Sequence, residues 1–88
     1  MASYSLVVKP SVWKDLRRLP KPIVARVLSR FEELRDEPWP LQSLKLEGVE
    51  DLFRLRVGSY RIIYSVDAGA RELIVHHVRH RREAYRKL

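Results

Sequence analysis

The sequence predicts an α+β fold of order β-α-α-β-β-β, with a helical hairpin packed on an antiparallel meander sheet and a short C-terminal helix. Apolar residues recur at helical spacing between residues 12 and 34, and alternating stretches follow from residue 44 onwards. Only short turns separate those later stretches, so they should pair as antiparallel neighbours with one face left for the helices. We expect one domain, residues 1–88.

The first half should contain one strand and two helices. A short strand spans Tyr4–Lys9 and stops at Pro10, and Ser11 is a suitable N-cap for the first helix. The prolines of "LPKP" end that helix. Pro22 then stands at the start of "IVARVLSRFEELRD", whose apolar stripe covers roughly four turns. The proline turn should make the two helices an antiparallel hairpin.

The second half should consist mainly of strands. Glu37–Ser43 is expected to be a loop, because Pro38 and Pro40 flank Trp39. The predicted strand "LKLEG" follows, and then the hairpin "LFRLRVGSYRIIYSVD". The turn "DAGA" leads into the strand "RELIVHHV", and the basic tail "RHRREAYRKL" is expected to form about one helical turn.

The hairpin places arginines opposite one another. "VGSY" suits a two-residue type II′ turn with glycine at its first central position. This turn sets Arg56 opposite Arg61 and Arg54 opposite Ile63. Leu52 and Ile63 share the face of the arginines, and the other apolar residues of the hairpin lie on the opposite face. Directly opposed like charges destabilise a sheet. We interpret the arginine face as an anion site; the alternative is a solvated face on which the side chains spread apart.

Charge is unevenly distributed along the chain. The formal net charge is +7, and the sequence pI is close to 10.3. Residues 1–51 contain nine Lys/Arg and eight Asp/Glu, a net of +1, whereas residues 52–88 contain nine and three, a net of +6. Eight of the nine later cations are arginines, whose planar donors match phosphate. This asymmetry favours a polyanion such as RNA over a surface charged only for solubility.

Several classes of site are not expected. The chain has no cysteine, which excludes thiolate catalysis and a cysteine-based zinc site. His76 and His77 should point to opposite faces of their strand and therefore cannot converge on one metal ion. The sequence has neither an apolar run long enough for a membrane span nor a signal-peptide pattern. We expect a cytoplasmic protein that uses no cofactor or metal and binds no membrane or small-molecule ligand.

Together with "VRHRREAYR", the hairpin resembles the RelE/ParE superfamily of toxins from type II toxin–antitoxin systems. The resemblance spans the chain and is strongest over residues 44–88. Members of the RelE branch are ribosome-dependent endoribonucleases that cut mRNA in the A site by 2′-OH attack, without a metal. The resemblance therefore implies a translation-inhibiting toxin whose partners are the ribosome, mRNA and a cognate antitoxin.

The resemblance also suggests roles for individual residues. Arg61 matches a phosphate-contacting arginine, Arg81 a catalytic arginine, and Tyr85 a tyrosine that stacks on or protonates the substrate; a C-terminal plug on the core is the alternative for Tyr85. His80, with an ordinary pKa of about 6.5, is a candidate for proton exchange. The expected RNA-binding residues are Arg54, Arg56, Arg79 and Arg82. Arg54 stands where some relatives have a lysine base and cannot readily accept a proton, so the general base stays open.

Two other functions remain open. ParE-type toxins share the fold, inhibit DNA gyrase and cut no RNA, and several keep a similar "HRR-x-x-Y" ending. A plain RNA-binding module would hold phosphate without cleaving it and would show steep salt dependence. Trp39 is expected either to contact the antitoxin or to pack against the helices.

Overall fold

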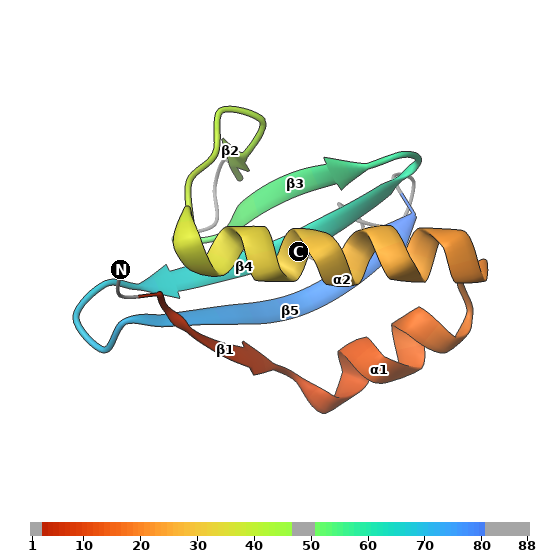
Figure 1. Cartoon of the computed structure of the whole chain (residues 1–88), viewed down its shortest axis with the longest axis horizontal. Helices are drawn as coiled ribbons and strands as arrows, with labels where there is room; N and C mark the ends of the chain where they lie inside the picture. The colour runs from red at the N-terminus through yellow and green to blue at the C-terminus, as the bar shows by residue number, and fades with distance from the viewer. Residues whose placement is uncertain (1–2, 47–50, 81–88) are drawn as a thin grey trace.

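The computed structural model describes residues 3–46 and 51–80. In chain order the elements are β1 (Ser5–Val8), α1 (Pro10–Arg17), α2 (Lys21–Asp36), β2 (Leu44–Lys45), β3 (Phe53–Val57), β4 (Tyr60–Asp67) and β5 (Glu72–His80). Figure 1 shows α2 crossing in front of the strands and α1 below β5, and the two helices run in roughly opposite directions, as the sequence predicts. The expected C-terminal helix lies outside the described residues.

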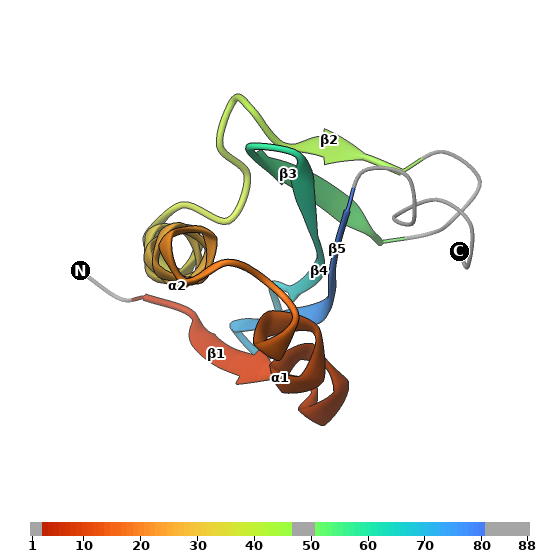
Figure 2. The same cartoon turned by 90° about the vertical axis from the view of Figure 1, so that its right-hand side faces the viewer.

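The five strands form one sheet in the order β1-β5-β4-β3-β2. Strands β2 to β5 make the predicted antiparallel meander. β1 pairs with β5 in parallel, from Ser5 opposite Glu72 to Val8 opposite Val75, so the complete sheet is mixed. The two helices connect β1, at one edge of the sheet, to β2 at the opposite edge. Figure 2 shows α2 end-on beside the sheet. No helix in the described part of the chain has the length and apolar character of a membrane span.

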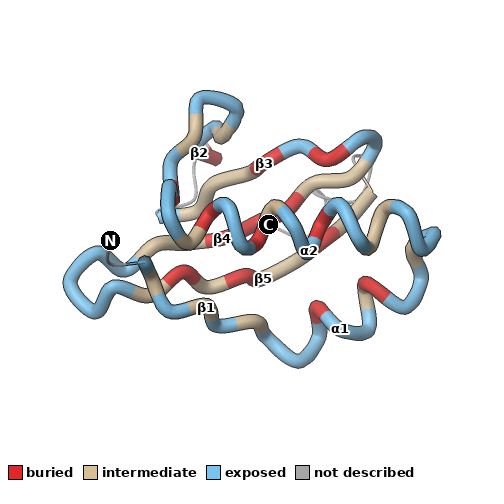
Figure 3. Tube along the Cα trace, in the orientation of Figure 1, coloured by how far each residue is buried: buried red, intermediate tan, exposed pale blue. Residues whose placement is uncertain are grey.

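The main core lies between the helices and one sheet face (Figure 3). Its fully buried side chains include Val12 of α1, Phe31 of α2 and Tyr64 of β4, so both helices pack on the same face. Most hairpin residues predicted for this face belong to it, among them Leu55, Val57 and Ile62. A second, smaller cluster lies on the opposite face and consists of Leu46, Ile63 and the partly buried Leu52.

The start of α1 differs from the prediction. The helix begins at Pro10 and its N-cap is Lys9, which makes no side-chain capping bond, so Ser11 lies inside the helix. Proline at the first helical position needs no hydrogen-bond acceptor and already has a helical φ, so it replaces a capping side chain here. The predicted role of Pro22 is confirmed, because it lies within the first two positions of α2.

Trp39 joins an aromatic cluster. It is 48% exposed, and its ring meets Tyr4 and Phe53 edge-on, at centroid distances of 6.4 and 6.5 Å. Phe53 in turn stacks on Tyr64, whose hydroxyl donates a 2.7 Å hydrogen bond to the carbonyl of Pro38. Trp39 therefore packs against aromatic residues that border the main core.

Candidate functional site

The β3–β4 hairpin has the predicted register. Arg56 lies opposite Arg61, and Arg54 lies opposite Ile63. Gly58 has a φ of 60°, while Ser59 does not have a positive φ, which is the pattern of a type II′ turn. The two arginines are therefore direct neighbours on the face that the helices leave open.

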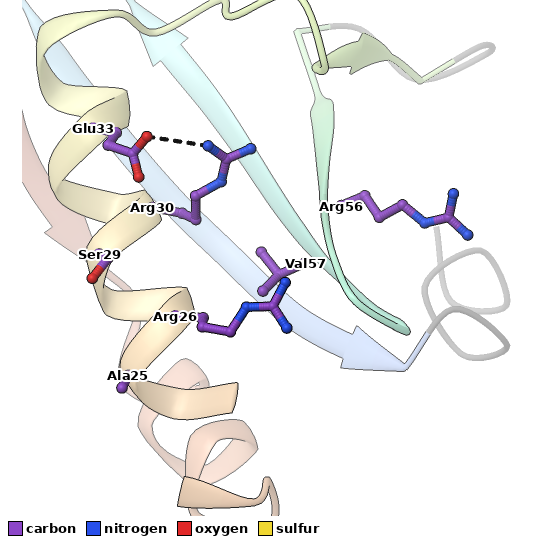
Figure 4. Close-up of a pocket in the computed structure, with 7 residues that line it drawn as sticks. All are labelled: Ala25, Arg26, Ser29, Arg30, Glu33, Arg56 and Val57. Carbon is purple, nitrogen blue, oxygen red and sulfur yellow. Dashed lines mark hydrogen bonds and ion pairs between the residues drawn. The ribbon is translucent and has the colours of Figure 1, made fainter. Parts of the chain in front are cut away.

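β5 adds a third arginine to this pair. Arg79 lies opposite Arg61 on the other side of β4, so Arg56, Arg61 and Arg79 form one row across three adjacent strands, here named the arginine row. Neighbouring strands are about 4.8 Å apart, and directly opposed residues share a face. Figure 4 shows Arg56 pointing away from α2. The row concentrates positive charge on the open face.

A cavity of about 440 Å³ adjoins this row. Its lining residues are Gln42, Leu44, Arg54, Arg56, Gly58 and Arg61. Three guanidinium groups thus contribute to one hollow, and no described lining residue is a carboxylate. Planar N–H donors of this kind bind phosphate oxygens in pairs, and Leu44 offers an apolar surface beside them. The cavity is suited to an anionic ligand such as a nucleotide segment.

A second cavity of about 440 Å³ lies between α2 and the edge of β3 (Figure 4). Arg26, Arg30 and Arg56 line it, but so does Glu33, which accepts a 3.1 Å hydrogen bond from Arg30. This carboxylate offsets part of the positive charge. We therefore place the candidate anion site at the first cavity, next to the arginine row.

Asp15 of α1 contacts Arg79, the residue of the arginine row that lies on β5. One carboxylate oxygen accepts a 3.2 Å hydrogen bond from the N–H of Val78, which lies beyond the stretch of β5 that β1 pairs with. The other oxygen lies 3.3 Å from Nε of Arg79. That contact lacks hydrogen-bond geometry, so it is an attraction between charges. Asp15 therefore satisfies a strand-edge donor and anchors Arg79 at the same time.

The prediction that the two mid-strand histidines face opposite ways is wrong. The pairing of β4 with β5 shifts register between Ile63 and Tyr64: Ile63 lies opposite His77, Tyr64 opposite Val75, and His76 is the extra residue. His77 shares the face of Ile63, and Nε2 of His76 reaches Ser65 Oγ at 2.8 Å, also on that face. A β-bulge interrupts the alternation of side chains and so brings both histidines to the open face.

The environments of the two histidines differ. Burial lowers the pKa of His76, and the nearby Lys9 and His77 lower it further. His77 instead lies beside the arginine row, with Nη2 of Arg79 at 3.4 Å from its Nδ1. The candidate site residues inferred from sequence did not include His77, because the length of the turn "DAGA" left open which of the two histidines faces the arginines. Among the described residues, no cluster of three metal-ligating side chains occurs.

The structure brings together some of the predicted site residues. Arg54, Arg56, Arg61 and Arg79 share the open face. His80 does not join them: it lies opposite Tyr60 on the helix-covered face, and the two rings meet edge-on at 5.5 Å. Arg81, Arg82 and Tyr85 lie outside the described residues.

Comparison with known proteins identifies the family. Residues 6–85 match the family described as the ParE toxin of the type II toxin-antitoxin system parDE. The chain is 30% identical over 84 residues to toxin RelE of Mycobacterium tuberculosis, covering 94% of this chain and 87% of that toxin.

Two solved complexes have the same fold. The archaeal RelE–RelB complex of Pyrococcus horikoshii contains a chain with a TM-score of 0.81 and 34% identity, covering 93% of this chain and 99% of that one. The toxin–antitoxin complex RelBE2 of M. tuberculosis gives a TM-score of 0.77 and 27% identity, covering 89% and 98%. The chain described here therefore belongs to the RelE/ParE superfamily of type II toxin–antitoxin toxins.

Proposed function

We propose that this toxin is a ribosome-dependent endoribonuclease that cuts mRNA in the A site by attack of a ribose 2′-OH and needs no metal. The observation that carries the proposal is the arginine row next to a cavity lined by three guanidinium groups. A sheet built only for stability would not oppose Arg56 and Arg61 directly. Similarity to toxins named RelE supports the same activity.

The arginines would act through charge. Attack of the 2′-oxygen on phosphorus raises the negative charge on the phosphoryl oxygens, and fixed cations stabilise that charge in the transition state. We assign this role to Arg61 and Arg56, which line the cavity together, and assign an adjoining phosphate to Arg54. Guanidinium groups cannot take the 2′-OH proton, so another group must act as base. Arg81 and Tyr85 remain proposed catalytic residues, and Arg82 remains a proposed RNA contact.

We also propose a cognate antitoxin that neutralises the same face. The similar complexes from P. horikoshii and M. tuberculosis contain a toxin with its antitoxin. An antitoxin segment rich in Asp and Glu would complement the arginine row and compete with RNA for it. Such competition should weaken as the salt concentration rises.

The test is primer extension on an mRNA in a reconstituted translation system. Wild type should produce cuts at A-site codons only when ribosomes are present, and Arg61→Ala and Arg81→Ala should abolish them. Arg26→Ala is the matched control, because Arg26 lines the cavity on the helix side and should retain cutting. Circular dichroism should show that every variant is folded. Cutting that persists in both arginine variants would refute the site assignment.

The match to the ParE family favours a second candidate, inhibition of DNA gyrase without RNA chemistry. A supercoiling assay with purified gyrase separates the two functions. Inhibition of supercoiling by a folded protein that leaves no RNA ends would replace the ribonuclease proposal. The arginine row would then be a binding surface only.

A further inference from the structure

His77 lies on the open face of the sheet, in contact with Arg79 of the arginine row. We propose that His77 is the general base that takes the 2′-OH proton, an inference that rests on the ribonuclease function proposed above. The proposal assigns a catalytic role to a residue that the family resemblance did not point to. It depends on the bulge in β5, which sets the face of His77.

The position of His77 puts it within reach of a phosphate on the row. His77 and Arg79 are two residues apart on β5 and share a face, so their Cβ atoms are about 6.6 Å apart. His77 is also the diagonal neighbour of Arg61 across β4 and β5, at about 7 Å. Imidazole and guanidinium side chains span such distances. A phosphate bound by Arg61 would therefore bring its ribose close to the imidazole.

The contact with Arg79 indicates which nitrogen of His77 can accept a proton. Nη2 of Arg79 lies 3.4 Å from Nδ1 of His77. A guanidinium group only donates, so Nδ1 must be the acceptor and the proton of the neutral ring must be on Nε2. The lone pair of Nδ1 therefore points towards a cation of the arginine row. A neutral imidazole whose lone pair faces a cation of the row is the form that a general base requires.

The arrangement of Asp15 and Arg79 keeps this geometry in place. The side chains of Arg79 and Asp15 are 21% and 12% exposed, so their ion pair is largely shielded from water. It holds the guanidinium beside His77 even without substrate. A contact of 3.4 Å is long for a hydrogen bond, so a substrate hydroxyl can replace the guanidinium proton at Nδ1 at little cost.

The other two histidines do not suit this role. The sequence contains three histidines, and all three are described. Nε2 of His76 is bound to Ser65, and His80 packs against Tyr60 on the opposite face. Arg54 has a pKa too high to accept the proton. His77, by contrast, contacts Arg79 of the row through Nδ1.

The proposed cleavage transfers one proton to His77, and one bond to phosphorus forms as another breaks. Nδ1 of His77 accepts the 2′-OH proton while the 2′-oxygen forms a bond to phosphorus. The bond from phosphorus to the 5′-oxygen breaks, and that oxygen takes a proton from water. The imidazolium returns its proton to the resulting hydroxide. The products are a 2′,3′-cyclic phosphate and a 5′-hydroxyl end, with no redox change.

Single-turnover cleavage of ribosome-bound mRNA tests the proposal. His77→Ala should cut at least about 100-fold more slowly than wild type, in line with the loss of a general base. His76→Ala is the matched control, since it removes the neighbouring histidine of the same bulge, and should stay within about threefold of wild type. Added imidazole should restore part of the rate to His77→Ala and none to Arg61→Ala. Melting curves should show that the variants remain folded.

The outcomes separate the two proposals. Wild-type cutting together with full-rate cutting by His77→Ala would overturn the assignment of the base and leave the ribonuclease intact. Slow cutting by a folded His77→Ala that imidazole does not accelerate would also overturn it, because the residue would then act through structure. A wild-type protein that never cuts would overturn both.

Discussion

The two faces of one sheet differ in what their residues contribute. On the helix-covered face, Leu55, Ile62 and Tyr64 are fully buried among side chains of α1 and α2. On the open face of the same strands, Arg56 and Arg61 oppose each other, which weakens the strand pairing. One well-packed face can therefore stabilise strands whose other face carries binding residues at a cost to strand pairing. Substitutions that act on one face at a time can test this division.

The largest effect should come from the adjacent residues Ile62 and Ile63. Both are fully buried, but Ile62 lies in the main core and Ile63 in the small cluster with Leu46. Ile62→Ala should lower the free energy of unfolding by about 4 kcal/mol, and Ile63→Ala by about 2 kcal/mol. The second loss is smaller because fewer side chains surround the void left by Ile63. Urea unfolding measures both values. Equal losses would show that the open face contributes as much to stability as the covered one.

Asp15 should give the next largest effect. Asp15→Ala leaves the N–H of Val78 without its acceptor and the charge of Arg79 without its partner. We expect a loss of about 2 kcal/mol in the free energy of unfolding. Asp15→Asn keeps an oxygen for Val78 and should lose about 1 kcal/mol, which isolates the charge. Thermal melting compares the two variants, and an unchanged melting temperature for Asp15→Ala would contradict the anchoring role.

Substitution of Arg56 should raise stability but slow RNA cleavage. Arg56→Gln removes a like-charge contact with Arg61 and should raise the free energy of unfolding by about 0.5 kcal/mol. The same change removes a cation from the cavity and should slow cleavage. Arg26→Gln, on the helix side, serves as control and should affect cleavage little. A stability loss in Arg56→Gln would mean that the row supports the fold after all.

Substitution of His76 should have the smallest effect, a change in how stability depends on pH. Its pKa in the folded state is lowered by burial and by Lys9 and His77, so the unfolded chain binds a proton first as the pH falls. Its contribution to stability is therefore present above about pH 6.5, the ordinary pKa of histidine, and is lost as the pH falls below that value.

His76→Gln should reduce this acid sensitivity, because an amide does not titrate and can still bond to Ser65. Melting temperatures measured at about pH 7.5 and about pH 5.5 provide the comparison. The variant should lose less stability than wild type on acidification. An equal loss in both proteins would assign the acid sensitivity to other groups.

Much of the hairpin and its arginine pair could be predicted because the signals are local. The turn "VGSY" sets the register of the two strands it joins, and alternation then assigns Arg54, Arg56 and Arg61 to one face. The apolar stripe of α2 has a period that only a helix satisfies, and Pro22 suits its first turn. These features depend on residues that are near neighbours in the sequence.

The rest depended on contacts between residues far apart in the chain. The parallel pairing of β1 with β5 and the anchoring of Arg79 by Asp15 both join segments more than sixty residues apart. At His76, β5 has one residue more than the facing stretch of β4, which is the bulge. The alternation of apolar and polar residues in the sequence cannot reveal such an insertion. The sequence by itself determined the two opposed arginines. Only tertiary packing decided that Arg79 extends their row and that His77 lies beside it.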